Sequence, residues 1–422
     1  MIGVGISAGL TGAKRARSIQ DPLPALDLDW ATNRSLPAAY GPTPSFSRAS
    51  TGTFFNSSGV LTTAAINAPR FNHIYNGSSW ISKGLLIEEQ RTNLIGNSED
   101  LQNYATTGAI TQNSTVAPDG TMTADTLTMD VGSGEYRIRS FPGAITSAFT
   151  ASIYAKKGTH RYLQLRTNGG GGWANFDLET GSSSAYSGAS ASIFNAGNGW
   201  YRCCCTYAAS SPNNHSVSMV SSMTSGYPEF ITGTGTESFF MWGYQIEVGS
   251  FATSYIKSNS GSTTTRSADV CQISGADFSS FWNASEGSFA LEADSIGFAS
   301  TGSNRFFYAA QSGGVAFYSL DIDPTLGLEY RVVNSSLQAQ LTHTQPNAGV
   351  LFKHSLSYKV NDFASSLNGS AVATDTSGTL PTATSLGVGY FPGFNQHGNC
   401  HISRLRYYPV RLPNATLQVL ST

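Results

Sequence analysis

The sequence predicts an all-β protein that consists of two antiparallel β-sandwich domains of the jelly-roll type, preceded by an extended N-terminal anchor. Charged residues make up only 12% of the 422 residues, whereas about 25% is usual in soluble domains. Because Lys, Glu and Arg normally cover the surfaces of helices, this low share disfavours a helical protein. Aromatic residues contribute 11% of the chain, and 44 residues are Gly. Aromatic segments separated by Gly and Asn turns are typical of many short strands.

The first 45 residues are predicted to be an extended anchor segment. They contain a cluster of Pro residues, and Pro fixes φ and removes an amide donor: Pro22, Pro24, Pro37, Pro42 and Pro44. The segment has few apolar side chains for a core of its own. We therefore expect it to lie on a neighbouring protein or to wind around sister chains, and we expect a chain that starts near Phe46 to fold without it. Residues 46–104 are predicted to form a β-rich adaptor of short strands and turns.

Residues 105–257 are predicted to form the first sandwich. Apolar and polar residues alternate from Phe149 to Ala155 and again from Tyr162 to Arg166, which is the period that places one side of a strand in a core. The turn signal Asn198-Gly199 separates further strand-like segments. Trp200 and Trp242 lie inside such apolar segments, so we expect both to be core residues.

Residues 258–265 are predicted to be a linker, because they consist of Ser, Asn, Gly and Thr. Residues 266–422 are predicted to form the second sandwich. Asn368-Gly369 is the residue pair favoured in a tight hairpin turn. Residues 414–420 are predicted to form one short helix.

Composition excludes several classes of partner. The formal net charge is −2 and no long basic run occurs, so we expect no nucleic-acid partner. No stretch of 18 apolar residues occurs, so we expect no membrane insertion. At the N-terminus the basic residues follow the apolar part, which is the wrong order for a signal peptide. The five Cys residues include three in succession; we expect them to be buried, reduced side chains rather than a disulfide framework.

The sequence gives no firm catalytic or metal motif. Gly5-Ile6-Ser7-Ala8-Gly9 matches the nucleophile-elbow pattern, but too few residues precede it for the strand that an elbow requires. On a strand, Cys400 and His401 would point to opposite faces, which disfavours a metal site with His397. Glycoside hydrolysis needs two carboxylates across the scissile bond, and three pairs are candidates: Glu88/Glu89, Glu99/Asp100 and Asp321/Asp323. The side chains of adjacent residues on a strand diverge, which disfavours the first two pairs. We predict that the chain is not an enzyme and has no cofactor or metal.

A set of short segments links this chain to a known family of proteins. The segments are Phe46–Phe54, Gly84–Leu94, Asn97–Asp100, Ala117–Leu127, Gly199–Arg202, Gln245–Ile256 and His401–Pro409. Together they resemble the tail-fibre and head-spike-fibre family of bacteriophages, over about residues 46–422. The resemblance implies a carbohydrate-binding-module-like sandwich over 105–257 and a concanavalin-A-like (laminin-G-like) sandwich over 266–422. By analogy with related sandwiches, Glu99, Asp100 and Glu247 would be the ligands of a structural Ca²⁺, a question that the sequence leaves open.

The family resemblance implies a structural virion protein that mediates attachment to host surface glycan. The resemblance also implies a homotrimer. Because residues 1–100 have the least core of their own, we expect them to make most of the contacts between chains, and we expect residues 1–45 to anchor the chain to other virion proteins. A decoration or adaptor subunit without a ligand is the alternative, and a polysaccharide depolymerase is a second one. The sequence does not decide between tail and head.

Glycan binding needs an exposed aromatic face beside polar groups. Trp173 follows four Gly residues, and Tyr390, Phe391 and Phe394 lie in a segment with Gly and Pro before the last strand. These four aromatic residues are the predicted glycan contacts.

Overall fold

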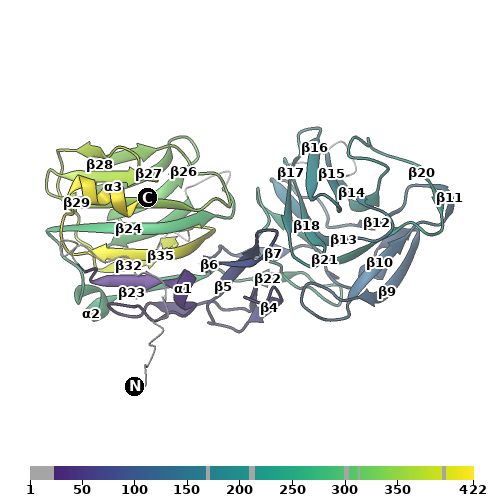
Figure 1. The fold of residues 1–422 in the computed structure, drawn as a ribbon, viewed down its shortest axis with the longest axis horizontal. Coiled ribbons are helices and arrows are strands. Elements are labelled where there is room, and N and C mark those ends of the chain that lie inside the picture. The colour runs from purple at the N-terminus through teal and green to yellow at the C-terminus, as the bar shows by residue number, and fades with distance from the viewer. Residues whose placement is uncertain (1–22, 168–171, 209–213, 299–303, 312–313, 392–395) are drawn as a thin grey trace, which may run out of the picture.

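The computed structural model describes residues 23–167, 172–208, 214–298, 304–311, 314–391 and 396–422. These residues form two β-sandwiches that lie side by side, with a small β-rich region between them (Figure 1). The long strands of both sandwiches pair antiparallel. The α-helices among the described residues are short: α1 (Trp30–Asn33), α2 (Gly275–Ser279) and α3 (Asn414–Leu420). The predicted all-β class with antiparallel sandwiches is therefore confirmed.

The first of these units, which we call the middle sandwich, consists of two six-stranded sheets. The β13 sheet has the order β17 (Ser190–Asn195), β18 (Trp200–Tyr207), β13 (Phe149–Lys157), β21 (Ser238–Val248), β10 (Ala124–Thr128) and β9 (Ala109–Thr115). The β14 sheet has the order β16 (Ser182–Tyr186), β15 (Trp173–Asp177), β14 (Tyr162–Thr167), β19 (His215–Met219), β12 (Arg137–Ser140) and β8 (Ala105–Thr107). A two-stranded ribbon of β11 (Val131–Gly134) and β20 (Ile231–Thr234) accompanies them.

The core of the middle sandwich lies between its two sheets. Ile153 and Cys203 of the β13 sheet and Leu165 and Val217 of the β14 sheet are fully buried members of one apolar cluster. These residues alternate along their strands with outward-facing neighbours, as the sequence pattern predicts. Trp200 and Trp242 are 2% and 1% exposed in a second, smaller cluster, which confirms them as core residues.

The second unit, which we call the terminal sandwich, is larger. One sheet has the order β31 (Ala373–Asp375), β30 (Phe363–Leu367), β29 (Phe352–Lys359), β24 (Glu286–Ser295), β35 (Cys400–Tyr408), β6 (Trp80–Ile87) and β5 (Phe71–Tyr75), and β1 (Leu26–Asp29) also pairs with β35. The facing sheet has the order β2 (Ser45–Ser47), β23 (Val270–Ser274), β32 (Ser385–Val388), β25 (Asn304–Ala310), β26 (Ala316–Asp323), β27 (Gly327–Asn334) and β28 (Ser336–His343).

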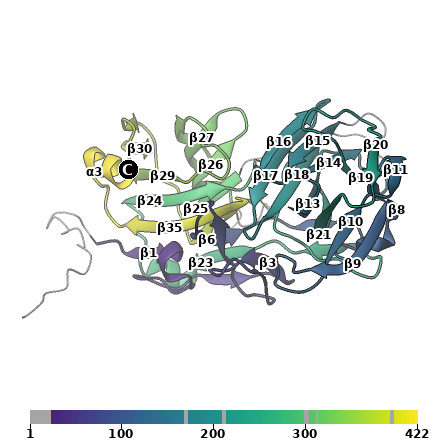
Figure 2. The same ribbon diagram turned by 45° about the vertical axis from the view of Figure 1, so that its right-hand side comes forward.

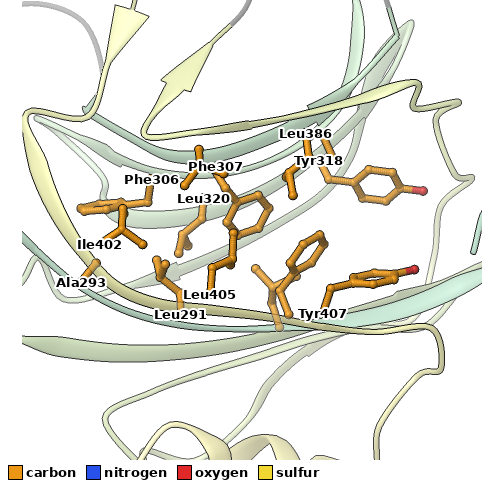
Figure 3. Close-up of a cluster of buried hydrophobic side chains, with 14 of the residues drawn as sticks. Leu291, Ala293, Phe306, Phe307, Tyr318, Leu320, Leu386, Ile402, Leu405 and Tyr407 are labelled. Carbon is orange, nitrogen blue, oxygen red and sulfur yellow. The ribbon is translucent and has the colours of Figure 1, made fainter. Parts of the chain in front are cut away.

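Apolar side chains from these two sheets meet in the core of the terminal sandwich. Figure 3 shows Leu291, Leu405 and Tyr407 of one sheet facing side chains of the other. The predicted turn at Asn368-Gly369 connects β30 to β31, and both residues have positive φ, 48° and 73°. The predicted helix at 414–420 is α3, whose N-cap is Pro413.

The N-terminal strands belong to the terminal sandwich. Leu26 and Leu28 of β1 are fully buried, and they alternate with Asp27 and Asp29, so one side of the strand enters the core while the other carries charge. β6 pairs with the start of β35, and β2 pairs with β23. The structure thus differs from the predicted division into an anchor at 1–45 and an adaptor at 46–104, since strands from both segments complete the terminal sandwich.

The middle sandwich is inserted between the two parts of the terminal sandwich. The chain leaves and returns through a ribbon of β7 (Arg91–Asn93) and β22 (Thr264–Arg266), near a second ribbon of β3 (Gly52–Phe55) and β4 (Leu61–Ala64) (Figure 1). Figure 2 shows β3 between β23 of the terminal sandwich and β9 of the middle sandwich. A 3₁₀ turn, Leu101–Asn103, lies between β7 and β8 in the chain. The predicted linker at 258–265 is held in this region, because Ser258 is buried and donates to the Ile95 carbonyl at 2.5 Å.

A buried charge network, which we call the junction network, lies where these segments meet. Arg48 and Arg70 contact Asp269 at 3.1 and 2.5 Å. Arg70 and Arg266 contact Glu88 at 2.7 and 2.9 Å. All five side chains are at most 1% exposed. The charged residues of the family-like segments around Arg48 and Glu88 therefore have a structural role, which is to hold together the chain segments that enter and leave the inserted sandwich.

No helix among the described residues combines the length and the apolar character needed to cross a membrane.

Candidate functional site

Trp173 is the predicted glycan contact that the structure places on a polar sheet surface. It begins β15, is partly exposed, and stacks on Tyr186 of the neighbouring strand with ring centroids 5.4 Å apart and planes inclined by 15°. Its indole nitrogen donates to the Ser225 carbonyl at 3.2 Å. The two rings are thus held in a stacked arrangement.

The other predicted contacts lie in the terminal sandwich, on the short ribbon of β33 (Tyr390–Phe391) and β34 (Gln396–His397). Phe391 is only 4% exposed, because its ring packs on Tyr308 at a centroid distance of 3.6 Å. It is therefore a packing residue in this structure. Tyr390 is partly exposed beside the ring of His397. Phe394 lies outside the described residues.

Strand register assembles a polar face around Trp173 on the outer side of the β14 sheet. Directly paired residues of antiparallel strands project to the same side, so one row crosses β12, β19, β14, β15 and β16: Arg139, Ser216, Arg166, Trp173 and Tyr186. A second row is displaced by two residues on each strand: Arg137, Ser218, Gln164, Asn175 and Ser184. We call these ten residues the outer polar face.

The inner side of the same strands explains why the outer side is polar. Ile138, Val217, Leu165 and Ala174 alternate with the polar residues and are buried in the core. Because side chains alternate across a strand, every residue of the two rows must point away from that core. The outer polar face is therefore a direct consequence of the alternating sequence pattern.

Positive charge dominates the outer polar face. Glu135 forms ion pairs with Arg137 and Arg166. Arg166 also lies 4.0 Å from the ring centroid of Tyr227. Burial lowers the pKa of Arg166 to about 10, so the guanidinium stays charged at neutral pH. The ten residues of the outer polar face and Glu135 together carry three positive charges and one negative charge, a net of two positive units.

Arg139 differs from the other two Arg residues of the face. It forms no ion pair with the described residues, and its buried Nε has no hydrogen-bond partner among them. Ser216, its direct partner on β19, is fully buried, and its Oγ likewise has no partner. The buried Oδ1 of Asn214, two residues earlier, is also unpaired. Three neighbouring polar groups thus lack hydrogen-bond partners among the described residues, and such groups often bind water or an ion.

A segment that contains residues 221–230 covers part of the second row. Gln164 donates to the Gly226 carbonyl at 3.2 Å, and Asn175 donates to the Met223 and Ser225 carbonyls at 3.0 and 2.8 Å. Tyr186 donates to the Met223 carbonyl at 2.7 Å. These hydrogen bonds satisfy the amides of the second row and fix the positions of Trp173 and Tyr186, so the first row is the part that has free polar groups.

Five of the six carboxylates considered as pairs in the sequence have side-chain partners in the protein: Glu88, Glu89, Glu99, Asp321 and Asp323. Glu88 belongs to the junction network, and Glu89 pairs with Arg91. Glu99 pairs with Lys257 at 2.6 Å, and Glu247 accepts from the Thr253 hydroxyl at 2.7 Å.

In the terminal sandwich, Asp321 pairs with Arg305 at 2.6 Å, whereas Asp323 accepts from the amide and hydroxyl groups of Thr325 in an exposed turn. Cys400 faces the core and His401 contacts Asp294 on the other side. Among the described residues, no group of three or more His, Cys, Asp or Glu side chains is arranged to hold a metal ion. The elbow pattern at Gly5–Gly9 lies outside the described residues.

Of the residues on the outer polar face, the sequence prediction named Trp173 and did not name Arg139, Ser216 or Arg166. A usable signal exists in the sequence, since Arg137 and Arg139 alternate with Tyr136, Ile138 and Ser140. Such alternation identifies an outward-facing polar row on one strand. It does not identify which strands lie next to one another.

No protein-family model matches the chain, and no curated protein matches it either. Among solved structures, the CBM40 module of the Ruminococcus gnavus IT-sialidase matches 36% of this chain and 98% of its own length, with 11% identity and a TM-score of 0.30. Domains LG4-5 of the mouse laminin α1 chain match 76% of this chain and 90% of theirs, with 11% identity and a TM-score of 0.22.

A third solved structure is Trypanosoma rangeli sialidase in complex with sialic acid, with 9% identity and a TM-score of 0.29. The match covers 70% of this chain and 53% of the sialidase. At these identities the likenesses concern the β-sandwich fold alone. Their TM-scores are too low to support an argument about ligand or activity.

Proposed function

We propose that this chain is a structural bacteriophage virion protein that attaches to host surface glycan through the outer polar face of the middle sandwich. The observation on which the proposal depends is the row from Arg139 to Tyr186, which places two stacked aromatic rings beside guanidinium and hydroxyl groups. Sites for small polar ligands combine such aromatic surface with a few polar groups that fix orientation.

The geometry favours weak binding by each chain. Trp173 and Tyr186 lie on a sheet surface, and a sheet surface encloses less of a ligand than a deep cavity does. We expect a dissociation constant in the millimolar range, or about −4 kcal/mol. Adhesion would then depend on several copies, because linked sites raise avidity by roughly 10² to 10⁴. A homotrimer supplies such copies.

The virion context is supported by the sequence segments described above rather than by the comparisons. In this proposal residues 1–22 bind other virion proteins, since β1 begins at Leu26 and belongs to the terminal sandwich. The second candidate function is a decoration or adaptor subunit without a ligand. The junction network favours it, because the family-like motif residues that it contains hold the fold together.

A binding experiment separates these two functions. The purified full chain, made multivalent on beads, would be tested against polysaccharides of candidate host bacteria, together with the variants Trp173→Ala and Phe194→Ala. Phe194 is a matched control, because it is 52% exposed on β17 of the opposite sheet. We expect Trp173→Ala to abolish retention of polysaccharide and Phe194→Ala to retain it, with both variants folded by thermal melting. Failure of the wild-type chain to retain any host polysaccharide would support the subunit without a ligand.

A further inference from the structure

The unpaired groups around Arg139 indicate which class of glycan the outer polar face accepts. A guanidinium that is partly buried without an anion is unfavourable, because its donors lose water and gain no acceptor. Elsewhere in the chain, the buried Arg48, Arg70 and Arg266 are each paired with a carboxylate. Arg139 is only partly exposed and forms no ion pair with the described residues, so no protein carboxylate balances its charge.

We propose that Arg139 and Ser216 bind the negative group of an acidic sugar, either a carboxylate or a phosphate. This inference rests on the proposed function, since it names the ligand class of the same face. Arg presents parallel N–H donors that match a carboxylate or phosphate in a bidentate way. The Ser216 hydroxyl is the direct cross-strand neighbour of Arg139 and has no hydrogen-bond partner among the described residues. Because Ser216 is fully buried, neighbouring side chains of the row must move for the anion to reach this hydroxyl.

The rest of the row supplies the remaining contacts of such a sugar. Arg166, next to Ser216 on β14, is held by Glu135 and Tyr227. Its positive charge adds to that of Arg139 without being free to move. Trp173 and Tyr186 continue the row, and Trp173 lies three strand positions from Arg139, which is about 14 Å at about 4.8 Å per strand. The sugar that stacks on Trp173 and the sugar whose negative group binds Arg139 are therefore different residues of one glycan chain. The row thus has an aromatic end and a cationic end, which suits an acidic polysaccharide of several sugars.

Two kinds of negative group, a carboxylate and a phosphate, would accept the same hydrogen bonds at this site. The carboxylate of a uronic or similar acid belongs to capsular and exopolysaccharides, whereas phosphate belongs to phosphate-linked polymers. Both accept from Arg and Ser. The test therefore uses a glucuronate-containing polysaccharide, the same polysaccharide after reduction of its carboxyl groups, and a phosphate-linked glycan polymer.

Binding of these three polymers would be measured for the full chain and for Arg139→Gln, Ser216→Ala and Arg34→Gln. Arg34→Gln is the matched control, because it removes the same charge from an exposed position of the terminal sandwich. We expect the wild-type chain to bind an acidic polymer about tenfold or more tightly than the reduced one, which is the effect of one charged hydrogen-bonded pair. Arg139→Gln should remove that preference, Ser216→Ala should reduce it, and Arg34→Gln should leave it unchanged.

The outcomes distinguish this inference from the function on which it rests. Tight binding of the phosphate polymer alone identifies phosphate as the anion and supports the inference. Equal binding of the acidic and reduced polymers, with loss of both in Trp173→Ala, overturns the inference and leaves glycan binding intact. An unchanged preference in Arg139→Gln overturns the role of Arg139. Absence of binding to all three polymers and to host polysaccharide overturns both proposals.

Discussion

Arg70 and Glu88 form an ion pair of 2.7 Å although neither side chain has any exposed surface. Burial by itself would raise the pKa of Glu88, but the positive charges of Arg266 and Arg70 and the hydrogen bonds from Ser254 lower it below its usual range. The Glu88 carboxylate is therefore ionised because of its partners. Asp269 contacts the other terminal nitrogen of the same Arg70 and also pairs with Arg48.

The first prediction concerns this pair. Glu88→Gln leaves two buried guanidinium groups with one counter-charge fewer, so we expect it to lower the free energy of unfolding by about 3–5 kcal/mol. Urea-induced unfolding measures the change. Glu179→Gln is the control, since Glu179 forms exposed ion pairs with Lys157 and Arg161, and such pairs contribute about 0–1 kcal/mol. Equal unfolding midpoints of the two variants would contradict a structural role for the network.

The second prediction concerns strand β1. The sequence suggested that a chain starting near Phe46 would fold normally, but Leu26, Leu28 and Trp30 have no exposed surface in the terminal sandwich. Burial of one such side chain contributes about 1.5–3 kcal/mol, so loss of all three should cost roughly 5 kcal/mol or more. Thermal melting should therefore show a large destabilisation for a chain that starts at residue 46. A chain that starts at residue 23 keeps β1 and should melt close to the full chain.

The third prediction concerns acid. His215 is fully buried between the hydroxyls of Tyr207 and Tyr244, and burial lowers its pKa to about 3 from 6.5. The unfolded chain therefore binds more protons than the folded chain between these two values, so stability is complete above about pH 6.5 and decreases as the pH falls. The slope contributed by one such group is at most about 1.4 kcal/mol per pH unit.

Urea unfolding between pH 7.5 and pH 5 tests this, because most carboxylates stay ionised in that range. His215→Asn removes the titrating ring, so the stability of this variant should depend less steeply on pH than that of the wild-type chain. Parallel pH profiles for the two proteins would show that His215 is not the source of the acid sensitivity.

The fourth prediction concerns the thiols. All five Cys residues are free and buried, as the sequence analysis expected of them. Burial raises the pKa of Cys204 to about 11 and that of Cys205 to about 12, and only the thiolate reacts readily. A thiol-reactive chromogenic disulfide should therefore detect no thiol in the folded chain and all five in guanidinium chloride. Rapid reaction of any thiol under native conditions would indicate that its strand opens.

The fifth prediction concerns assembly. We expect a homotrimer, with a particle mass three times the chain mass of 44.6 kDa. The sequence predicts that residues 1–100 make the contacts between chains because they have little core of their own. In the structure, residues 46–100 supply core strands, so this reason does not hold for them. Within them, the edge strand β5 and its neighbour β6 expose a cross-strand pair, Ile74 and Ile81, at 39% and 43%. Exposed apolar edges tend to be covered by another chain.

Mass photometry of Ile81→Lys tests that contact. We expect this variant to dissociate into single chains, because a buried ammonium without a partner opposes association. Val131→Lys is the control, since Val131 is 81% exposed on the ribbon of the middle sandwich. If both variants form trimers, the β5 edge is not the contact between chains. If the wild-type protein is a single chain at micromolar concentration, assembly needs the virion.

The sequence by itself determined the class of fold, the positions of many strands and one residue of the candidate site. Alternation from Tyr162 to Arg166 identifies both the core residues and the outward residues of β14, and the Gly run before Trp173 marks an aromatic residue at a strand end. These features depend on residues that are close in the chain, where backbone period and turn preferences act directly.

Only the tertiary structure decided which strands are neighbours. Pairing of Leu26 with Tyr407 and of Asp29 with Arg404 makes β1 part of the terminal sandwich, and pairing of Arg139 with Ser216 and of Ser216 with Arg166 assembles the outer polar face. Local patterns give the faces of a strand but not its partner, because many strands of similar pattern could pair. The choice depends on how all the apolar faces are buried at once, which is a property of the whole chain.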